Sequence, residues 1–299
     1  MAALVVTNDL DRRIWEEELA AFVPPAVFDV HTHVYDWAMT PPEGQAKANA
    51  LPAIWRRWPA STAEILDQVD AALLPGRRVS RLCFGNPLQE CDQAEANAFA
   101  ARQAAADPAS AALMLVRPSM SPDAVATAVE RWGFLGFKPY RLHSVTGDAA
   151  ECRITDFLPE AQLDVADRYG LIVMLHLSKS RAIGDPENLA DLDRLSSRFP
   201  RVRWVLAHAA RSYYDRPLLA AREILLRLPN LRYEISSVCD TDVFDVLLEI
   251  AGPDRVMYGS DDLPVGAGRG KYITFGRAWA ALDEENHRFN LGHCDGRMT

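Results

Sequence analysis

Two histidines spaced by one residue are the most informative chemical feature of this sequence. They lie in the run Val27–His33, which reads VFDVHTH. A β-strand turns alternate side chains to the same face, so the imidazoles of His31 and His33 would point to one place. Because neutral imidazole is a good ligand for zinc and related divalent ions, the pair is half of a metal site.

Later apolar runs also end in polar residues that could bind a metal ion or take part in catalysis next to it. They are Lys138, His176, His208 and Asp261. The chain has only seven histidines, and four of them take such positions. Three imidazoles and a carboxylate around a divalent ion would lower the pKa of a bound water towards 7. Asp261 could accept the proton of that water and later deliver it to a leaving group.

Eight short apolar runs of β type must position these side chains. Between them lie amphipathic stretches with helix-start signals, among them Ser61 with Glu64, Ser121-Pro122 and Asp185-Pro186. Strands that alternate with helices predict an α/β fold with a parallel sheet covered on both faces. Eight such units predict a single (β/α)8 TIM barrel, whose active site lies at the carboxyl ends of its strands. The runs are Val27–Val34, Val79–Phe84, Ala111–Val116, Phe134–Lys138, Leu171–His176, Val202–His208, Leu231–Ser236 and Arg255–Gly259.

We expect one domain over residues 1–299, with additions to the regular barrel. An extra N-terminal helix is predicted around Leu10–Phe22, within residues 1–26. A long insertion separates the first two strands, and long loops in compact domains are usually functional. We expect residues 35–60 of this insertion to form a lid over the substrate, with packing onto the barrel rim as the alternative. Residues 271–285 are expected to form the last helix, and residues 287–299 an irregular tail. The lid prediction rests on Trp37, Trp55, Arg56, Arg57 and Trp58.

Composition excludes several classes of function. The chain has 299 residues, of which 49% are hydrophobic and 24% charged, which is ordinary for a globular protein. Its formal net charge of -9 argues against a nucleic-acid partner. No apolar run is long enough to cross a membrane, and the acidic N-terminus does not resemble a signal peptide. Five scattered cysteines without a C-x-x-C pair favour reduced thiols. We therefore expect a cytoplasmic protein with a small-molecule substrate and a homodimer as a further possibility.

The sequence resembles the amidohydrolase superfamily, and within it the amidohydrolase-related branch that includes aminocarboxymuconate semialdehyde decarboxylase. The resemblance spans about Phe28 to Pro264 and rests on the ordered set of motifs described above. It implies one divalent ion, zinc or alternatively manganese. The implied metal ligands are His31, His33, His176 and Asp261. His208 is implied to be the catalytic histidine, beside Asp261, which would also take part in catalysis.

Three points stay open. The family pattern has one residue between the aspartate and a proline, whereas this chain has two, so Asp262 is the alternative to Asp261. Strand register favours Asp261, because a loop absorbs an insertion more easily than a strand does. In relatives with two metal ions, a carboxylated lysine takes the position of Lys138. An unmodified Lys138 would instead be a cation for an anionic substrate.

Arg141 and Arg211 lie just beyond the strand ends, as does His143, and the arginines could bind a substrate carboxylate through two hydrogen bonds. These features favour a metal-dependent hydrolase that acts on a small anionic molecule through a metal-activated water. Non-oxidative decarboxylation at the same site is the alternative. A barrel that has lost turnover and serves as a binding protein is a third hypothesis, against which the complete ligand set argues.

Overall fold

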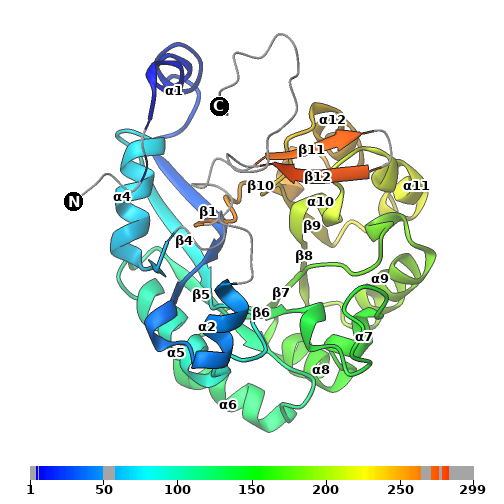
Figure 1. The fold of residues 1–299 in the computed structure, drawn as a ribbon. Coiled ribbons are helices and arrows are strands. Elements are labelled where there is room, and N and C mark those ends of the chain that lie inside the picture. Colours follow the sequence, from blue (N-terminus) through cyan, green and yellow to red (C-terminus); the bar gives the residue numbers. More distant parts are fainter. Residues whose placement is uncertain (1–4, 6, 50–57, 264–270, 276–277, 283–299) are drawn as a thin grey trace.

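Eight parallel strands surround a common axis and form the predicted barrel (Figure 1). The structure is a computed structural model that describes residues 5, 7–49, 58–263, 271–275 and 278–282. All eight predicted strands are present, within a few residues of the expected bounds. Their order around the sheet is β1 (Ala26–His33), β4 (Arg78–Phe84), β5 (Ala111–Val116), β6 (Gly136–Pro139), β7 (Ile172–Leu175), β8 (Arg203–Leu206), β9 (Leu231–Glu234) and β10 (Val256–Met257).

The barrel closes between its last and first strands. The backbone N–H of Val30 donates to the carbonyl of Tyr258 at 3.1 Å. Beyond the end of β10, Asp261 N–H donates to His31 O at 2.9 Å, and His33 N–H donates to Asp262 O at 2.8 Å. These bonds continue the parallel pairing past Met257, so the segment that carries Asp261 lies directly beside the two histidines of β1.

Helices cover the outside of the barrel (Figure 1). Two of the predicted helix starts are confirmed, because Ser121 and Asp185 cap helices whose first residue is a proline. The third start is shifted by one residue, since Thr62 rather than Ser61 caps its helix. The helices are α2 (Pro42–Asn49), α4 (Ala63–Leu73), α5 (Gln93–Ala104), α6 (Pro122–Trp132), α7 (Ile154–Phe157), α8 (Glu160–Tyr169), α9 (Pro186–Arg198), α10 (Ala207–Arg211), α11 (Arg216–Leu225) and α12 (Thr241–Ala251).

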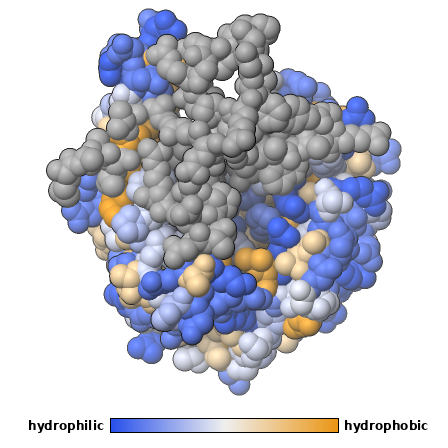
Figure 2. Space-filling model, viewed as in Figure 1, coloured by the Kyte–Doolittle hydropathy of each residue, from blue (hydrophilic) through white to orange (hydrophobic). Residues whose placement is uncertain are grey.

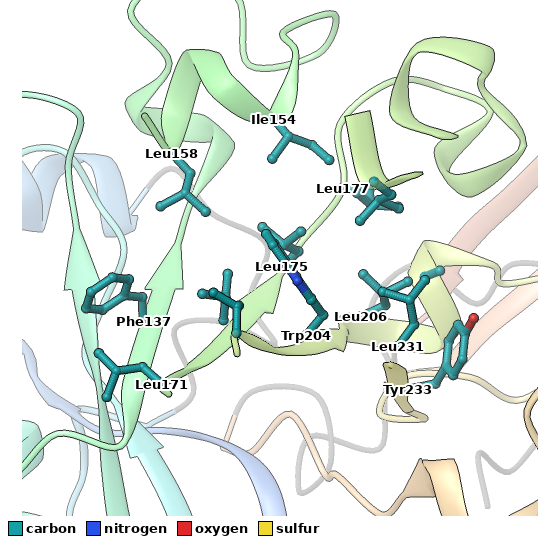
Figure 3. Close-up of a cluster of buried hydrophobic side chains, with 14 of the residues drawn as sticks. Phe137, Ile154, Leu158, Leu171, Leu175, Leu177, Trp204, Leu206, Leu231 and Tyr233 are labelled. Carbon is teal, nitrogen blue, oxygen red and sulfur yellow. The ribbon is translucent and has the colours of Figure 1, made fainter. Parts of the chain in front are cut away.

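Two apolar layers hold the barrel together. The outer layer lies between strands and helices and includes Phe137, Trp204 and Leu206 (Figure 3). The inner layer fills the barrel and consists of Leu82, Phe84, Leu113, Met174, Val205 and Ala207. A fully buried side chain of this size contributes roughly 1.5–3 kcal/mol. Because side chains alternate along a strand, the residue two positions after an inward-facing one also faces the inside of the barrel. Met174 of β7 faces inward, and the residue two positions later, just after β7, is His176.

The N-terminal helix is present as α1 (Asp9–Ile14) and a π-helical turn, η1 (Trp15–Leu19). It lies apart from the ring of helices (Figure 1). Arg77 connects it to the barrel, because its guanidinium lies 4.9 Å from the Trp15 ring and its Nε donates to Val23 O at 3.0 Å. Arg77 is thus one attachment of the N-terminal segment to the barrel, and the packing of Val5 in the outer apolar layer is another.

The insertion after β1 contains a short antiparallel pair, β2 (Tyr35–Asp36) and β3 (Ala60–Ser61), with a 3-10 turn, η2 (Trp37–Met39), after β2. Trp58 is buried in the outer apolar layer, and the Trp37 ring lies 5.0 Å from that of Tyr35. This packing agrees with the alternative that the tryptophans fix the insertion to the barrel. Trp55, Arg56 and Arg57 lie outside the described residues, so the lid stays a prediction.

The expected last helix is wrong. Residues 271–275 and 278–282 instead form an antiparallel pair, β11 (Lys271–Phe275) and β12 (Ala278–Leu282). The physical reason is local, because Tyr272-Ile273-Thr274-Phe275 consists of β-branched and aromatic residues that prefer strands. The predicted tail, 287–299, lies outside the described residues.

The visible outer surface is mainly hydrophilic, with smaller hydrophobic areas (Figure 2). Within the described part of the chain, no helix has both the length and the apolar character needed to cross a membrane.

Candidate metal centre

The centre of the site is a contact between His31 and Asp261. The Nε2 atom of His31 lies 3.3 Å from Asp261 Oδ1, and both side chains are buried. The second ring nitrogen, Nδ1, lies 2.8 Å from Glu234 Oε1. Each ring nitrogen faces a carboxylate, which only accepts hydrogen bonds, and the contact of Nδ1 with Glu234 is the shorter one, so the ring proton of neutral His31 is assigned to Nδ1. The Nε2 lone pair therefore faces the carboxylate of Asp261.

His33 repeats this relationship from two residues further along β1. Its Nε2 lies 3.4 Å from the same oxygen of Asp261. The hydroxyl of Tyr140 lies 3.3 Å from this nitrogen. The other carboxylate oxygen of Asp261 accepts a hydrogen bond from Ser237 Oγ at 2.8 Å, which fixes the rotation of the carboxylate. One oxygen of Asp261 is thus held towards two imidazoles.

His208 reaches the centre through an unusual backbone conformation. β8 ends at Leu206, and the following residues form a left-handed turn that begins with His208 at φ 56° and ψ 50°. Its Nδ1 lies 2.9 Å from Ser236 Oγ and 3.0 Å from Ser236 O. Ligand atoms of His31, His208 and Asp261 lie within 4.8 Å of one another. The histidine expected to be catalytic therefore also lies within ligand range, and its role stays a prediction.

His176 lies at the end of β7, and its ring centroid is 5.2 Å from that of His208. Its Nδ1 is buried and has no hydrogen-bond partner among the described residues. A buried, unpaired ring nitrogen costs free energy unless a ligand satisfies it. This is the state expected of a histidine whose partner is an ion or a substrate.

Protonation favours metal binding. Burial, reinforced by the Lys138 ammonium, lowers the pKa of His31 to about 4. The pKa of His176 is also well below its usual range, because of burial and then the neighbouring His208 and Lys138. Burial opposes ionisation of Asp261, but the surrounding histidines outweigh it and lower its pKa. At neutral pH, His31 and His176 are thus neutral and Asp261 is charged, as metal binding requires.

Glu234, at the end of β9, contacts the candidate ligands but is not among the residues predicted for the site. Besides His31, it accepts the backbone N–H of His208 at 2.7 Å and that of Ser236 at 2.8 Å. Burial raises its pKa, but His31 and His208 outweigh this and lower the value to about 2. In the sequence, only its place in the predicted strand Leu231–Ser236 gave a weak signal. A charged residue on the inner face of a barrel strand, at its carboxyl end, was the available clue.

The charges of three basic residues, Lys138, Arg141 and Arg211, act on His176. Lys138 is fully buried, and its Nζ has no hydrogen-bond partner among the described residues. This Nζ lies 5.0 Å from the Phe84 ring centroid and 5.4 Å from that of Tyr140, and burial lowers the Lys138 pKa to about 8. Arg141 and Arg211 each donate to a backbone carbonyl at 2.7 Å, of Ala149 and Lys179 respectively.

No carboxylate of the described residues forms an ion pair with Arg141 or Arg211. Burial, and then the charge of Arg141, lowers the pKa of Arg211, so the two guanidinium groups act on one another. Two cations held near each other without an acidic partner attract an anion. His143 belongs elsewhere, since its surroundings are Pro87, Arg117 and Glu90.

The geometry also bears on the choice between Asp261 and Asp262. The Asp261 carboxylate faces the histidines, whereas the charge of Asp262 acts on Tyr35 and Tyr258. Asp262 takes part in the barrel seam through its backbone carbonyl. The arrangement favours Asp261 as the ligand.

The donor set fits a divalent ion. Two ligand atoms about 2.1 Å from a tetrahedral ion are separated by about 3.4 Å. The two nitrogen–oxygen distances to Asp261 Oδ1 are 3.3 and 3.4 Å. At neutral pH, the His31 lone pair faces a carboxylate lone pair, and two acceptors at this distance repel unless a cation lies between them. The residues present therefore suit a metal ion.

Comparisons with known proteins agree with the expected family. The family model described as Amidohydrolase matches residues 28–289. No curated protein matches the chain. Among solved structures, the chain is similar to dihydroxybenzoic acid decarboxylase from Polaromonas sp. JS666 with bound manganese, at a TM-score of 0.57 and 15% identity over 81% of this chain and 88% of that one.

Two further structures have the same fold. One is 5-carboxyvanillate decarboxylase from Sphingomonas paucimobilis, with a TM-score of 0.50 and 18% identity over 82% of this chain and 91% of the other. The other is 4-oxalomesaconate hydratase from Rhodopseudomonas palustris, with a TM-score of 0.52 and 15% identity over 82% and 83%. At these identities the likeness concerns the fold.

Proposed function

Because the chain belongs to the amidohydrolase family, we propose that it is a metal-dependent hydrolase that acts on a small, carboxylate-bearing substrate. The observation that carries the proposal is the single oxygen of Asp261 between the Nε2 atoms of His31 and His33, at 3.3 and 3.4 Å. A buried carboxylate oxygen facing two imidazoles is suited to share a cation with them and to receive a proton.

His31, His33, His176 and Asp261 would hold one divalent ion, zinc or manganese. When bound, this ion would supply Lewis acidity for the activation of water and for the charge that develops on the substrate. The unpaired Nδ1 of His176 supports this ligand set, because an ion or a substrate would satisfy it. A second ion, bound through a carboxylated Lys138, is the alternative to the expected single ion.

The protein residues would divide the remaining work. Asp261 Oδ1 accepts the proton released by the attacking water and returns it to the leaving group. His208, fixed by Ser236, donates a hydrogen bond to the substrate carbonyl or takes a proton from the attacking group. Lys138, Arg141 and Arg211 bind the substrate carboxylate. The charged Asp261 and neutral His31 that this scheme requires match the directions of their pKa shifts.

Decarboxylation is the second candidate, and a specific observation favours it. The Lys138 ammonium is fully buried, and it lies 5.0 Å from the centroid of the Phe84 ring and 5.4 Å from that of Tyr140. A carboxylate drawn into such a place by the cation loses its hydration, which favours the loss of carbon dioxide. Two of the similar structures are decarboxylases of aromatic acids, which supports this alternative.

One experiment separates these functions. The purified protein is analysed for bound divalent metal, stripped with a chelator, and reloaded with zinc or manganese. Each form is then assayed against lactones, amides and aromatic acids, with released carbon dioxide measured in parallel. Hydrolysis that depends on the metal supports the first proposal, and metal-dependent release of carbon dioxide supports the second. A protein without affinity for either ion would overturn both and favour a binding role.

A further inference from the structure

We propose that Glu234 is a positioning residue for two histidines at once. It determines which nitrogen of His31 faces the ion, and it holds the backbone turn that presents His208. The inference deepens the proposed function and rests on it for the presence of an ion. The observations behind it are the contacts of one buried carboxylate with the ring of His31 and with the backbone N–H groups of His208 and Ser236.

The first contact controls the tautomer of His31. Glu234 Oε1 lies 2.8 Å from His31 Nδ1, and an ionised carboxylate can only accept a hydrogen bond. This contact is shorter than the 3.3 Å between Nε2 and Asp261 Oδ1, so Glu234 takes the proton of the neutral imidazole on Nδ1, and the lone pair of Nε2 is free to bind an ion on the side of Asp261. A negative charge on this side also raises the basicity of the opposite nitrogen, as carboxylates that contact metal-binding histidines do.

The second contact anchors the turn after β8. Four consecutive residues other than glycine have positive φ there, with values of 56°, 50°, 60° and 59° for His208, Ala209, Ala210 and Arg211. Left-handed backbone costs roughly 1–2 kcal/mol per residue, so this turn needs fixed ends. Glu234 Oε1 accepts the N–H of His208 at 2.7 Å at its start. At its other end, Arg211 donates to Lys179 O at 2.7 Å.

The third contact, together with tight packing, leaves the carboxylate no freedom. Its Oε2 accepts the N–H of Ser236 at 2.8 Å, and the side chain is fully buried. A Cβ on Gly259 would lie 2.7 Å from this oxygen and 2.9 Å from the Cβ of His31. Among the residues that the structure describes, the hydrogen bonds of the Glu234 carboxylate go to His31, His208 and Ser236, all of which lie at the site.

The test compares Glu234→Gln with Glu234→Ala. Glutamine keeps an acceptor for His31 and His208, but it removes the charge and places an NH2 group against the N–H of Ser236. Alanine removes all three contacts. Nitrogen NMR of the histidine rings in the metal-free protein reports the tautomer, and titration with Mn²⁺ reports affinity. We expect His31 of the unchanged protein to carry its proton on Nδ1. The variants should bind Mn²⁺ about 10- to 100-fold more weakly, alanine more so than glutamine.

Asp191→Asn is the matched control. Asp191 is a buried carboxylate that pairs with Arg153 at 2.6 Å on the outside of the barrel, so its loss should lower thermal stability and leave Mn²⁺ affinity unchanged. Variants of Glu234 that lose stability but keep normal Mn²⁺ affinity would overturn the proposal, as would His31 protonated on Nε2 in the unchanged protein. If Glu234→Ala does not fold, the Mn²⁺ affinity of Glu234→Gln decides the test. If the unchanged protein binds no Mn²⁺, the proposed function fails. The position of the His31 ring proton, measured by NMR, then still tests the role of Glu234.

Discussion

Asp29 and Ser260 fasten the first strand of the barrel to the segment after the last one. Asp29 Oδ1 accepts the backbone N–H of Ser260 at 3.0 Å and that of His31 at 2.9 Å. The hydroxyl of Ser260 donates to the second oxygen of Asp29 and accepts the N–H of Asp262 at 3.0 Å. Because the N–H of His31 itself bonds to Asp29 and Asp261 follows Ser260 directly, the same bonds fix the spacing between two candidate ligands.

Ser260→Ala should therefore weaken the seam of the barrel. It removes a hydrogen bond to a buried carboxylate and leaves the N–H of Asp262 without this acceptor. A bond to a charged group is worth about 1.5–3 kcal/mol, and we expect a loss of unfolding free energy of that size. Urea denaturation measures it. The exposed Ser180→Ala serves as the control and should change little; equal stability of both variants would refute the role of the seam.

Removal of a ligand histidine should abolish metal retention. We expect His31→Ala and His176→Ala to lose the bound ion, whereas His208→Ala keeps the ion and loses turnover. Elemental analysis after gel filtration gives the metal content, and a turnover assay completes the comparison. Since His208 lies within ligand range of His31 and Asp261, loss of the ion from His208→Ala would reassign it as a ligand.

Arg141→Gln should affect substrate binding more than metal binding. Arg141 donates one N–H to Ala149 O, and its remaining donors have no acidic partner among the described residues. Loss of one charged hydrogen bond to a substrate carboxylate corresponds to a fall of about 10- to 100-fold in kcat/KM. The metal content should stay unchanged. Arg181→Gln, an exposed arginine paired with Asp185, is the control, and an effect as large in that variant would contradict the assignment.

Stability should fall as the pH decreases from about 6.5 towards 4, in part because of His143. Burial, then the nearby Arg117, lowers the pKa of His143 from 6.5 to about 4. The unfolded chain therefore binds a proton in this range that the folded chain resists, and the contribution of the neutral imidazole is fully present only above about pH 6.5. The slope from one such group is at most about 1.4 kcal/mol per pH unit. His143→Gln should flatten the dependence of unfolding free energy on pH; an unchanged slope would contradict this.

Gly259→Ala should disturb the site through steric contact. The added Cβ would press on Glu234 Oε2 and on His31, and overpacking of this kind typically costs about 1–3 kcal/mol. We also expect weaker metal binding. Gly133→Ala is a matched control, because its φ of +67° makes alanine unfavourable while no atom lies within 4 Å of the added Cβ. The Gly133→Ala variant should have a lower free energy of unfolding but the same metal affinity as the unchanged protein. If metal titration finds that Gly259→Ala binds the ion with unchanged affinity, the absence of a side chain at residue 259 is not needed for the site.

Local pattern was sufficient for the barrel and for part of the site. Strand alternation places His31 and His33 on one face, and the inner face that holds Met174 also carries His176. These placements follow from a backbone period of two, which is a local property of the chain. The strand pair formed by residues 271–275 and 278–282 shows the limit of pattern reading, since a segment expected to be helical contains β-branched and aromatic residues that prefer strands.

His208, Asp261 and Glu234 show what only the tertiary structure decided. Continued alternation after Val205 and Ala207 would send His208 outward, but a left-handed turn directs it into the site. Asp261 likewise has a positive φ, and its neighbours across the seam hold it towards the histidines. The hydrogen bonds that stabilise both conformations come from residues distant in the chain, Glu234 and Ser237. Because local sequence disfavours such backbone, only contacts made after the barrel closes can select it.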